Sequence, residues 1–377
     1  MRFNPLYVVV LLAMSLHVAF TGVRVNLSLF ALSLQASPFT VGAILSLIAL
    51  LPTFFSVPAG RGIDRIGVRG PLVAGSIGVL GGTVLAALVP RLAVLFVASC
   101  LVGSGFMLVF IAANHIAGEL GEAHDRAKNF SLLALAFSTS GFLGPMMTGV
   151  AIDRIGYRAT FLLLGGFALL TLVGVLSARC EVPRHEGRAA ADELRLRDLF
   201  RNRTLRYVFL ATGVLSPAWD LFTFVVPIHG SQIGLSATEI GLILGTFGGA
   251  IFCVRLIVPL VLHRVSEWQM LVAAMLSAGA TYFAFPLVHG MPLLLTFAFI
   301  LGFGLGGAQP MIMSLLYSKA PVGRGAEAVG VRTLIINASQ TGMPLLFGGL
   351  GEALGMIPVF WGMAVCLLSG GIFARKR

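Results

Sequence analysis

The chain has 377 residues, of which 57% are hydrophobic and only 11% are charged, and its mean hydropathy is +0.96. This composition excludes an ordinary soluble domain and indicates a membrane protein. The formal net charge of +11 comes mostly from Lys and Arg between the apolar runs, so we predict no basic face for nucleic acid.

Apolar runs follow one another along the whole chain, and each is close to the ~20 residues that a helix needs to cross a bilayer. They do not alternate apolar and polar residues, as the strands of an outer-membrane barrel would. We therefore predict an all-α membrane protein with twelve transmembrane helices, the first a retained helix and not a signal peptide. The predicted spans lie near residues 8–33, 41–59, 71–89, 92–117, 129–152, 159–177, 207–230, 240–262, 270–288, 293–317, 331–350 and 356–373.

The first predicted helix carries a polar stripe. Its residues are spaced by four, three and four positions and so share one helical face: His17, Thr21, Arg24 and Ser28. A charge at mid-bilayer costs at least ~2.5 kcal/mol on insertion scales and rarely faces lipid. Because Arg24 is too deep in its helix to reach the interface easily, we expect this stripe to face a substrate pathway.

The seventh predicted helix carries a matching stripe of Thr212, Ser216, Asp220 and Thr223, with Trp219 beside the carboxylate. Asp220 is the only carboxylate that we place deep inside a predicted helix. Pro217 frees a backbone carbonyl one turn earlier and can bend the helix there. These features predict that the seventh helix also faces the pathway, with Asp220 as a proton site.

Other polar residues inside the apolar runs are weaker candidates for the pathway. The tenth helix contributes Gln309, and the fourth contributes Asn114 and His115, although His115 near the helix end is equally explained as a solvated histidine. The eleventh helix carries Asn337, Ser339 and Gln340. These side chains form hydrogen bonds either in the cavity or only between helices.

Two further Arg residues and the cysteines do not indicate a site. Arg255 lies in the eighth helix, well short of its cytoplasmic end, and Arg332 opens the eleventh helix. A long Arg side chain can extend from either position to the membrane interface. The four cysteines have no spacing typical of a metal site or a disulfide framework. We predict no metal and no cofactor.

An internal repeat organises the chain. Adding 199 to a residue number maps Ser37 to Ser236, Pro145 to Pro344 and Asp153 to Glu352, and no gap is needed over more than a hundred residues. The repeat predicts two six-helix bundles, residues 1–178 and 207–377, joined by a charged cytoplasmic linker, residues 179–206. Within the first half, the string Gly-x-x-Ile-Asp-Arg-Ile-Gly-x-Arg occurs at residues 60–69 and again at 149–158.

The Lys and Arg distribution predicts the orientation. If both termini are cytoplasmic, the opposite side holds only Arg91, Arg154 and Arg158. We therefore expect a multi-pass protein of the cytoplasmic (inner) membrane with both termini in the cytoplasm. The basic amphipathic stretch of the linker is expected to lie on anionic lipid.

A parallel duplication of inverted three-helix units, together with the loop motif at residues 60–69, resembles the major facilitator superfamily, of the bacterial twelve-helix type. The resemblance covers essentially the whole chain and implies a pseudo-two-fold axis along the membrane normal. It also implies that helices one, four, seven and ten line a central cavity. The loop motif is similar to the cytoplasmic gate of that family, which implies gate roles for Gly60, Asp64, Arg65, Gly67, Arg69 and Arg332.

By this resemblance, Asp64 accepts hydrogen bonds from the amino end of the eleventh helix, near Arg332, whereas the external copy at Asp153 matters less. The alternative is that the motif only ends a helix and holds it cytoplasmic. The fifth helix also resembles the Gly-Pro motif of the family's antiporters, at Gly141, Gly144, Pro145 and Gly149, although Ser140 and Thr148 stand where that motif usually has Gly. Small residues that allow close helix packing explain it equally well.

The predicted function is secondary active transport of a small organic solute by alternating access. Arg24 favours an organic anion, and the expected partners are this substrate, protons and the lipid bilayer, with the protein as a monomer. The alternative is a proton-driven efflux pump for hydrophobic or drug-like compounds, which Trp219 and the many Phe residues favour. A receptor is less favoured, and no hydrolase or ATP-binding motif indicates an enzyme.

The 199-residue offset also predicts a charge pair. Arg24 and Asp220 lie on equivalent helices one turn apart in the repeat, so we expect them to approach across the boundary between the halves. The pair would serve either as a substrate and proton switch or as a static bridge that holds the halves in register.

Overall fold

The computed structural model describes residues 5–119, 126–177, 203–261, 266–319 and 325–375. The described residues are helical, with no strand among them. The first half contains α1 (Pro5–Ser33), α2 (Pro38–Ile66), α3 (Arg69–Leu88), α4 (Leu92–Glu119) and α5 (Arg126–Ser177). The second half contains α7 (Arg203–Gln232), α8 (Ala237–Val261), α9 (Glu267–Ala284), the short 3₁₀ helix η1 (Phe285–Leu287), α10 (Met291–Lys319), α11 (Gly325–Leu354) and α12 (Met356–Arg375).

The long element α5 consists of two membrane helices in sequence. Its 52 residues would extend about 78 Å as one straight helix, far more than the ~30 Å of a bilayer core. Gly156 interrupts it with φ 79° and ψ 168°, a left-handed φ that favours glycine. With α5 counted as two, the described residues form twelve α-helices, as predicted. Ten elements of this described part, with α5 counted once, have the length and composition of membrane spans.

The repeated string does not begin a loop as predicted. The helix α2 continues through Ile66 and ends at Gly67, where φ is 87°. Gly67 and Gly156 occupy the same position of the repeated string, so both copies run to the end of a helix and use their second glycine to break it. The predicted linker falls largely outside the described residues, and the division into two domains stays a prediction.

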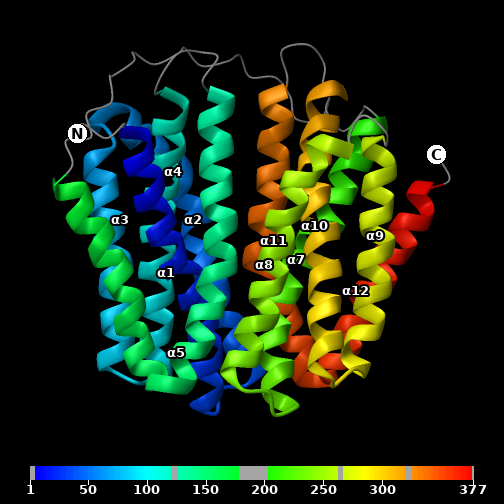
Figure 1. The fold of residues 1–377 in the computed structure, drawn as a ribbon, viewed down its shortest axis with the longest axis horizontal. Helices are drawn as coiled ribbons and strands as arrows, with labels where there is room; N and C mark the ends of the chain where they lie inside the picture. Colours follow the sequence, from blue (N-terminus) through cyan, green and yellow to red (C-terminus); the bar gives the residue numbers. More distant parts are fainter. Residues whose placement is uncertain (1–4, 120–125, 178–202, 262–265, 320–324, 376–377) are drawn as a thin grey trace.

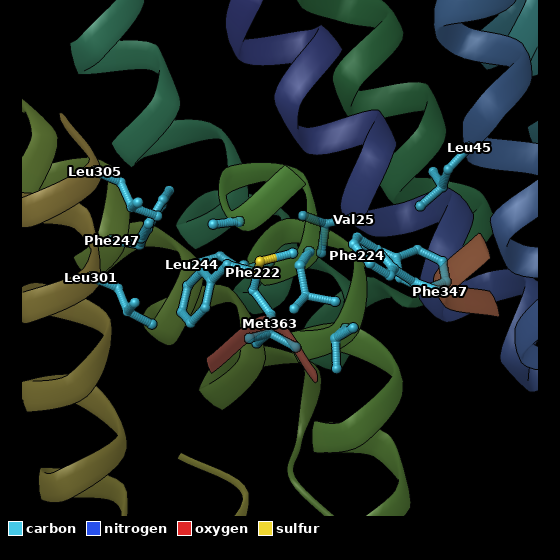
Figure 2. Packing of buried hydrophobic residues seen from close by; sticks show 14 of the residues in the cluster. Val25, Leu45, Phe222, Phe224, Leu244, Phe247, Leu301, Leu305, Phe347 and Met363 are labelled. Atoms are coloured by element: carbon cyan, nitrogen blue, oxygen red, sulfur yellow. The ribbon is translucent and has the colours of Figure 1, made fainter. Parts of the chain in front are cut away.

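Two buried clusters show where the halves join. One contains residues from both halves, among them Val25 of α1, Leu45 of α2, Phe224 of α7 and Phe347 of α11 (Figure 2). The other contains first-half residues only, including Leu6 and Ile116 at the end where the termini lie. The halves therefore share a core on the face opposite the termini, here called the distal face, where α2 and α8 begin (Figure 1).

Candidate transport pathway

Asp220 is a buried carboxylate held between two helices of the second half. Its side chain is only 4% exposed, and its Oδ2 accepts a 2.7 Å hydrogen bond from the Ser339 hydroxyl of α11. Buried Tyr282 of α9 also lies within electrostatic reach of Asp220, and its hydroxyl donates to the Ala218 carbonyl. Sequence reasoning missed Tyr282, because the sequence does not indicate which residue a tyrosine in an apolar helix will contact.

Arg24 of α1 interacts electrostatically with Asp220 across the boundary between the halves. Within the described part of the chain, Arg24 makes no hydrogen bond and no ion pair within 4.0 Å. The two charges therefore act on each other through space instead of forming a direct bridge. Each is on the helix where the sequence predicted it.

His17 is tied to the fifth helix of its own half. Its Nδ1 lies 2.5 Å from the Ser140 hydroxyl, and Thr21 donates to the carbonyl of Ser140 at 3.2 Å. Three phenylalanine rings surround the imidazole: Phe20, Phe106 and Phe137. One of the two departures from the Gly-Pro motif thus supplies the hydroxyl that contacts His17.

Arg255 of α8 is hydrogen-bonded to the opposite half, a contact that the sequence did not predict. Its Nη1 donates to the Ala134 carbonyl at 3.0 Å and to the Ser138 hydroxyl, both in α5 of the other half. A guanidinium removed from water is stabilised by such acceptors. Arg255 and Arg24 both lie within electrostatic range of His17, and sequence reasoning placed only Arg24 on the pathway.

The remaining predicted pathway residues are dispersed. Among the described residues, the hydroxyl of buried Ser28 has no hydrogen-bond partner. Buried Ser216 precedes the Pro217 turn, and Thr223 donates to the backbone carbonyl of Asp220 in its own helix. Trp219 packs edge-on against Phe247, and Asn114 donates to the Phe110 carbonyl of its own helix. His115, Asn337 and Gln340 are partly exposed.

The predicted cytoplasmic gate is only partly described. Arg65 and Arg69 are exposed, and Arg69 donates to the Leu176 carbonyl at 3.2 Å. Arg332 does not open its helix as predicted, because α11 begins seven residues earlier at Gly325, and its guanidinium donates to Gln309 of α10. The side chain of Asp64 lies outside the described residues, so its contact with α11 stays a prediction.

The Gly-Pro motif of α5 forms a close contact with α8. A Cβ atom on Gly248 would lie 2.5 Å from the Gly141 carbonyl oxygen, and one on Gly241 would lie 2.6 Å from that of Pro145. Gly149 faces Ala237 at the start of α8, whereas Gly144 faces Thr21 of α1. The motif therefore lets α5 approach backbone to backbone with a helix of the other half.

Comparison with known proteins agrees with this architecture. The family model described as "Major Facilitator Superfamily" matches residues 9–341. The chain is 26% identical over 323 residues to a tetracycline resistance protein, class G, of Vibrio anguillarum, covering 83% of this chain and 80% of that protein. It is 24% identical over 250 residues to the MFS-type transporter pynF of Aspergillus niger, covering 65% of this chain and 56% of that protein.

Solved structures share the fold at low identity. A crystal structure of a POT family transporter in complex with a thioalcohol conjugated peptide superimposes with a TM-score of 0.84 at 15% identity, covering 98% of this chain and 95% of that one. The nucleoside transporter NupG gives a TM-score of 0.84 at 12% identity, covering 99% of each chain. The sequence-based prediction of a transporter and not an enzyme is confirmed by the family match. The chain belongs to the major facilitator superfamily of membrane transporters.

Proposed function

We propose that this transporter carries a small organic anion across the cytoplasmic membrane and couples its movement to protons. It works as a monomer with both termini in the cytoplasm. The observation that carries the proposal is buried Asp220, which interacts electrostatically with Arg24 of the opposite half. The few Arg residues expected on the external side support the orientation.

The charges of the interior support an anionic substrate. Arg24 and Arg255 contribute two guanidinium groups within electrostatic range of His17, whereas Asp220 is the single buried carboxylate among the described side chains. An uncompensated cation in a lipid-free interior is costly. A substrate carboxylate that binds between these guanidinium groups relieves that cost, which a neutral or cationic substrate does not.

Asp220 supplies the coupling step. In its ionised form, Asp220 accepts a hydrogen bond from the Ser339 hydroxyl and partly neutralises the charge of Arg24. When Asp220 takes up a proton at a carboxyl oxygen, its charge is lost and Arg24 is free to bind the substrate anion. Release of the anion restores the field of Arg24, which favours loss of the proton from Asp220. Proton and anion thus occupy the site together.

The experiment uses purified protein in liposomes that contain a trapped pH-sensitive dye. A panel of mono- and dicarboxylates is added, each beside its neutral amide analogue. Proton movement is expected with at least one carboxylate and with none of the amides. Accumulation of an anion that is unchanged by a protonophore would contradict the coupling, and movement of amides alone would contradict the anion.

A second candidate is proton-driven efflux of hydrophobic compounds. Phe20 and Phe106 stack at 4.0 Å beside His17, and Phe110 stacks on Phe137, which supplies an aromatic surface for a flat ligand. The resemblance to a tetracycline resistance protein also supports this function. In everted vesicles, a proton flux elicited by tetracycline or by a cationic dye, and by no carboxylate, would favour efflux over anion transport.

A further inference from the structure

Two helices, one in each half, each carry a proline, a glycine and an acidic residue along one side of the helix near the distal face of the molecule. The residues are four positions apart and so lie one above another on the helix. They are Pro145, Gly149 and Asp153 in α5 and Pro344, Gly348 and Glu352 in α11, each pair separated by 199.

Each acidic residue caps the first turn of a helix in the opposite half. Asp153 accepts from the backbone N–H of Thr238 at 2.7 Å through Oδ2 and from that of Ala237 at 3.3 Å through Oδ1. Glu352 accepts from the backbone N–H of Phe39 at 3.3 Å. The first N–H groups of a helix have no partner inside it, and negative charge is favoured there.

Beside the change from Asp to Glu, one sequence difference accounts for the second hydrogen bond of the Asp153 cap. Ala237 and Pro38 are the first residues of α8 and α2 and are related by the offset. Proline has no N–H to donate, so Glu352 can reach only the next residue, Phe39. Asp153 therefore makes the stronger contact.

The glycines bring the carboxylates within reach of those N–H groups. A Cβ atom on Gly348 would lie 2.6 Å from the Pro38 carbonyl oxygen, and Gly149 faces the Ala237 carbonyl in the same way. The helices therefore touch backbone to backbone one turn before each acidic residue. At this separation the carboxylate of Asp153 spans the remaining distance to α8.

We propose that Asp153 and Glu352 form a two-point latch that holds the distal face closed during part of the transport cycle. Both contacts join one half to the other, so both must break when the halves separate on this face. The latch sets the balance between the two accessible states and acts whatever the substrate is. The sequence assigned this role to the cytoplasmic copy at Asp64, whereas the described cross-half caps belong to the distal copies.

The chain offers a matched control at the same helix end. Glu239 of α8 accepts from the Ser236 N–H at 2.8 Å and from the Ser236 hydroxyl at 3.0 Å, entirely within the second half. Glu239→Gln therefore removes a carboxylate from the start of α8 without touching a contact between the halves. A general loss of helix capping would affect Asp153→Asn and Glu239→Gln alike.

The test measures how often the distal face opens. In full-length protein with its four cysteines replaced by serine, Val25→Cys places a reporter in the core that both halves share. An impermeant maleimide is added from the side opposite the termini. Asp153→Asn and Glu352→Gln are each expected to raise the labelling rate about two- to fivefold, which is the effect expected of a charge at a helix end. The increase should be larger for Asp153→Asn. In the double variant, the increase should be close to the product of the two single increases. Glu239→Gln is expected to leave the rate unchanged.

A strengthening variant tests the same idea without removing any contact. Pro38→Ala restores an N–H in the first turn of α2, so the labelling rate should fall, and this fall should vanish in the Glu352→Gln background. An unchanged rate in the Asp153→Asn and Glu352→Gln double variant would overturn the latch. So would a Pro38→Ala effect that is independent of Glu352.

Discussion

Arg255 of α8 donates a 3.0 Å hydrogen bond to the backbone carbonyl of Ala134 in α5, so a cation of the second half is held by the first. Arg24 has the reverse relationship, since this first-half cation lies in the field of Asp220 from the second half. Each half therefore contributes a guanidinium group that interacts with the other half. Any movement of one half against the other changes the surroundings of both guanidinium groups, which is what alternating access requires of a binding site.

Arg255→Gln is expected to weaken anion transport. Loss of the guanidinium removes one of the two cations near His17, so the KM for the anion should rise about tenfold, equivalent to about 1.4 kcal/mol. Ser138→Ala is the control, because it removes one hydrogen-bond acceptor of Arg255 and keeps the charge. Initial rates of uptake into proteoliposomes over a range of substrate concentrations measure both. An unchanged KM in Arg255→Gln would exclude Arg255 from anion binding.

Asp220→Asn is expected to separate substrate movement from proton movement. The amide cannot change charge, so anion exchange across the membrane should continue while net accumulation driven by a pH gradient falls about tenfold or more. Ser339→Ala removes the hydrogen bond to Asp220 and retains its carboxylate, so this control should remain coupled. Counterflow and gradient-driven uptake are measured side by side. Accumulation at the parent level in Asp220→Asn would assign the proton to another group.

The sequence predicted the helices and the two polar stripes better than it predicted the contacts between them. The length of the apolar runs and the 199-residue offset can both be read directly from the sequence. Both placed Arg24 and Asp220 on helices that meet. The contacts of Arg255 were not predicted, because its partners are a carbonyl and a hydroxyl more than a hundred residues away. The caps of Asp153 and Glu352 were missed for the same reason, although the offset had already paired them with each other.

Gly241→Ala is expected to destabilise the contact between α5 and α8. The added methyl group would lie 2.6 Å from the Pro145 carbonyl oxygen, and a backbone atom cannot move aside without displacing its helix, so a loss of about 1 to 3 kcal/mol is expected. Gly166→Ala is the control, since Gly166 is helical and no atom of the described residues lies within 4 Å of an added Cβ. Thermal unfolding in detergent should show a lower midpoint for Gly241→Ala alone. Equal midpoints would mean that these helices are not held in close contact.

Asp64→Asn tests the cytoplasmic gate that the family resemblance implies. If the carboxylate caps the start of α11 when the cytoplasmic side closes, its loss should reduce transport several-fold while expression and membrane insertion stay at parent levels. Arg61→Gln is a nearby control, because Arg61 is an exposed residue of the same helix end. Undiminished flux in Asp64→Asn would leave the motif with only the structural role of ending α2.

The charge-swapped variant, Arg24→Asp combined with Asp220→Arg, separates a binding pair from a static bridge. A static bridge needs only opposite charges at the two positions, so the swapped protein should fold and transport. A binding pair needs the guanidinium on α1, near His17 and Arg255, and the proton-accepting carboxylate beside Ser339. We expect the swapped protein to fold and to lose transport, because the carboxylate is then moved away from its hydrogen-bond donor and into the anion site. Each single substitution should fold poorly, because Arg24→Asp leaves two carboxylates and Asp220→Arg leaves two guanidinium groups in the same interior region. Expression, detergent stability and uptake are measured for all three variants. Transport by the swapped protein at the parent rate would decide for the bridge.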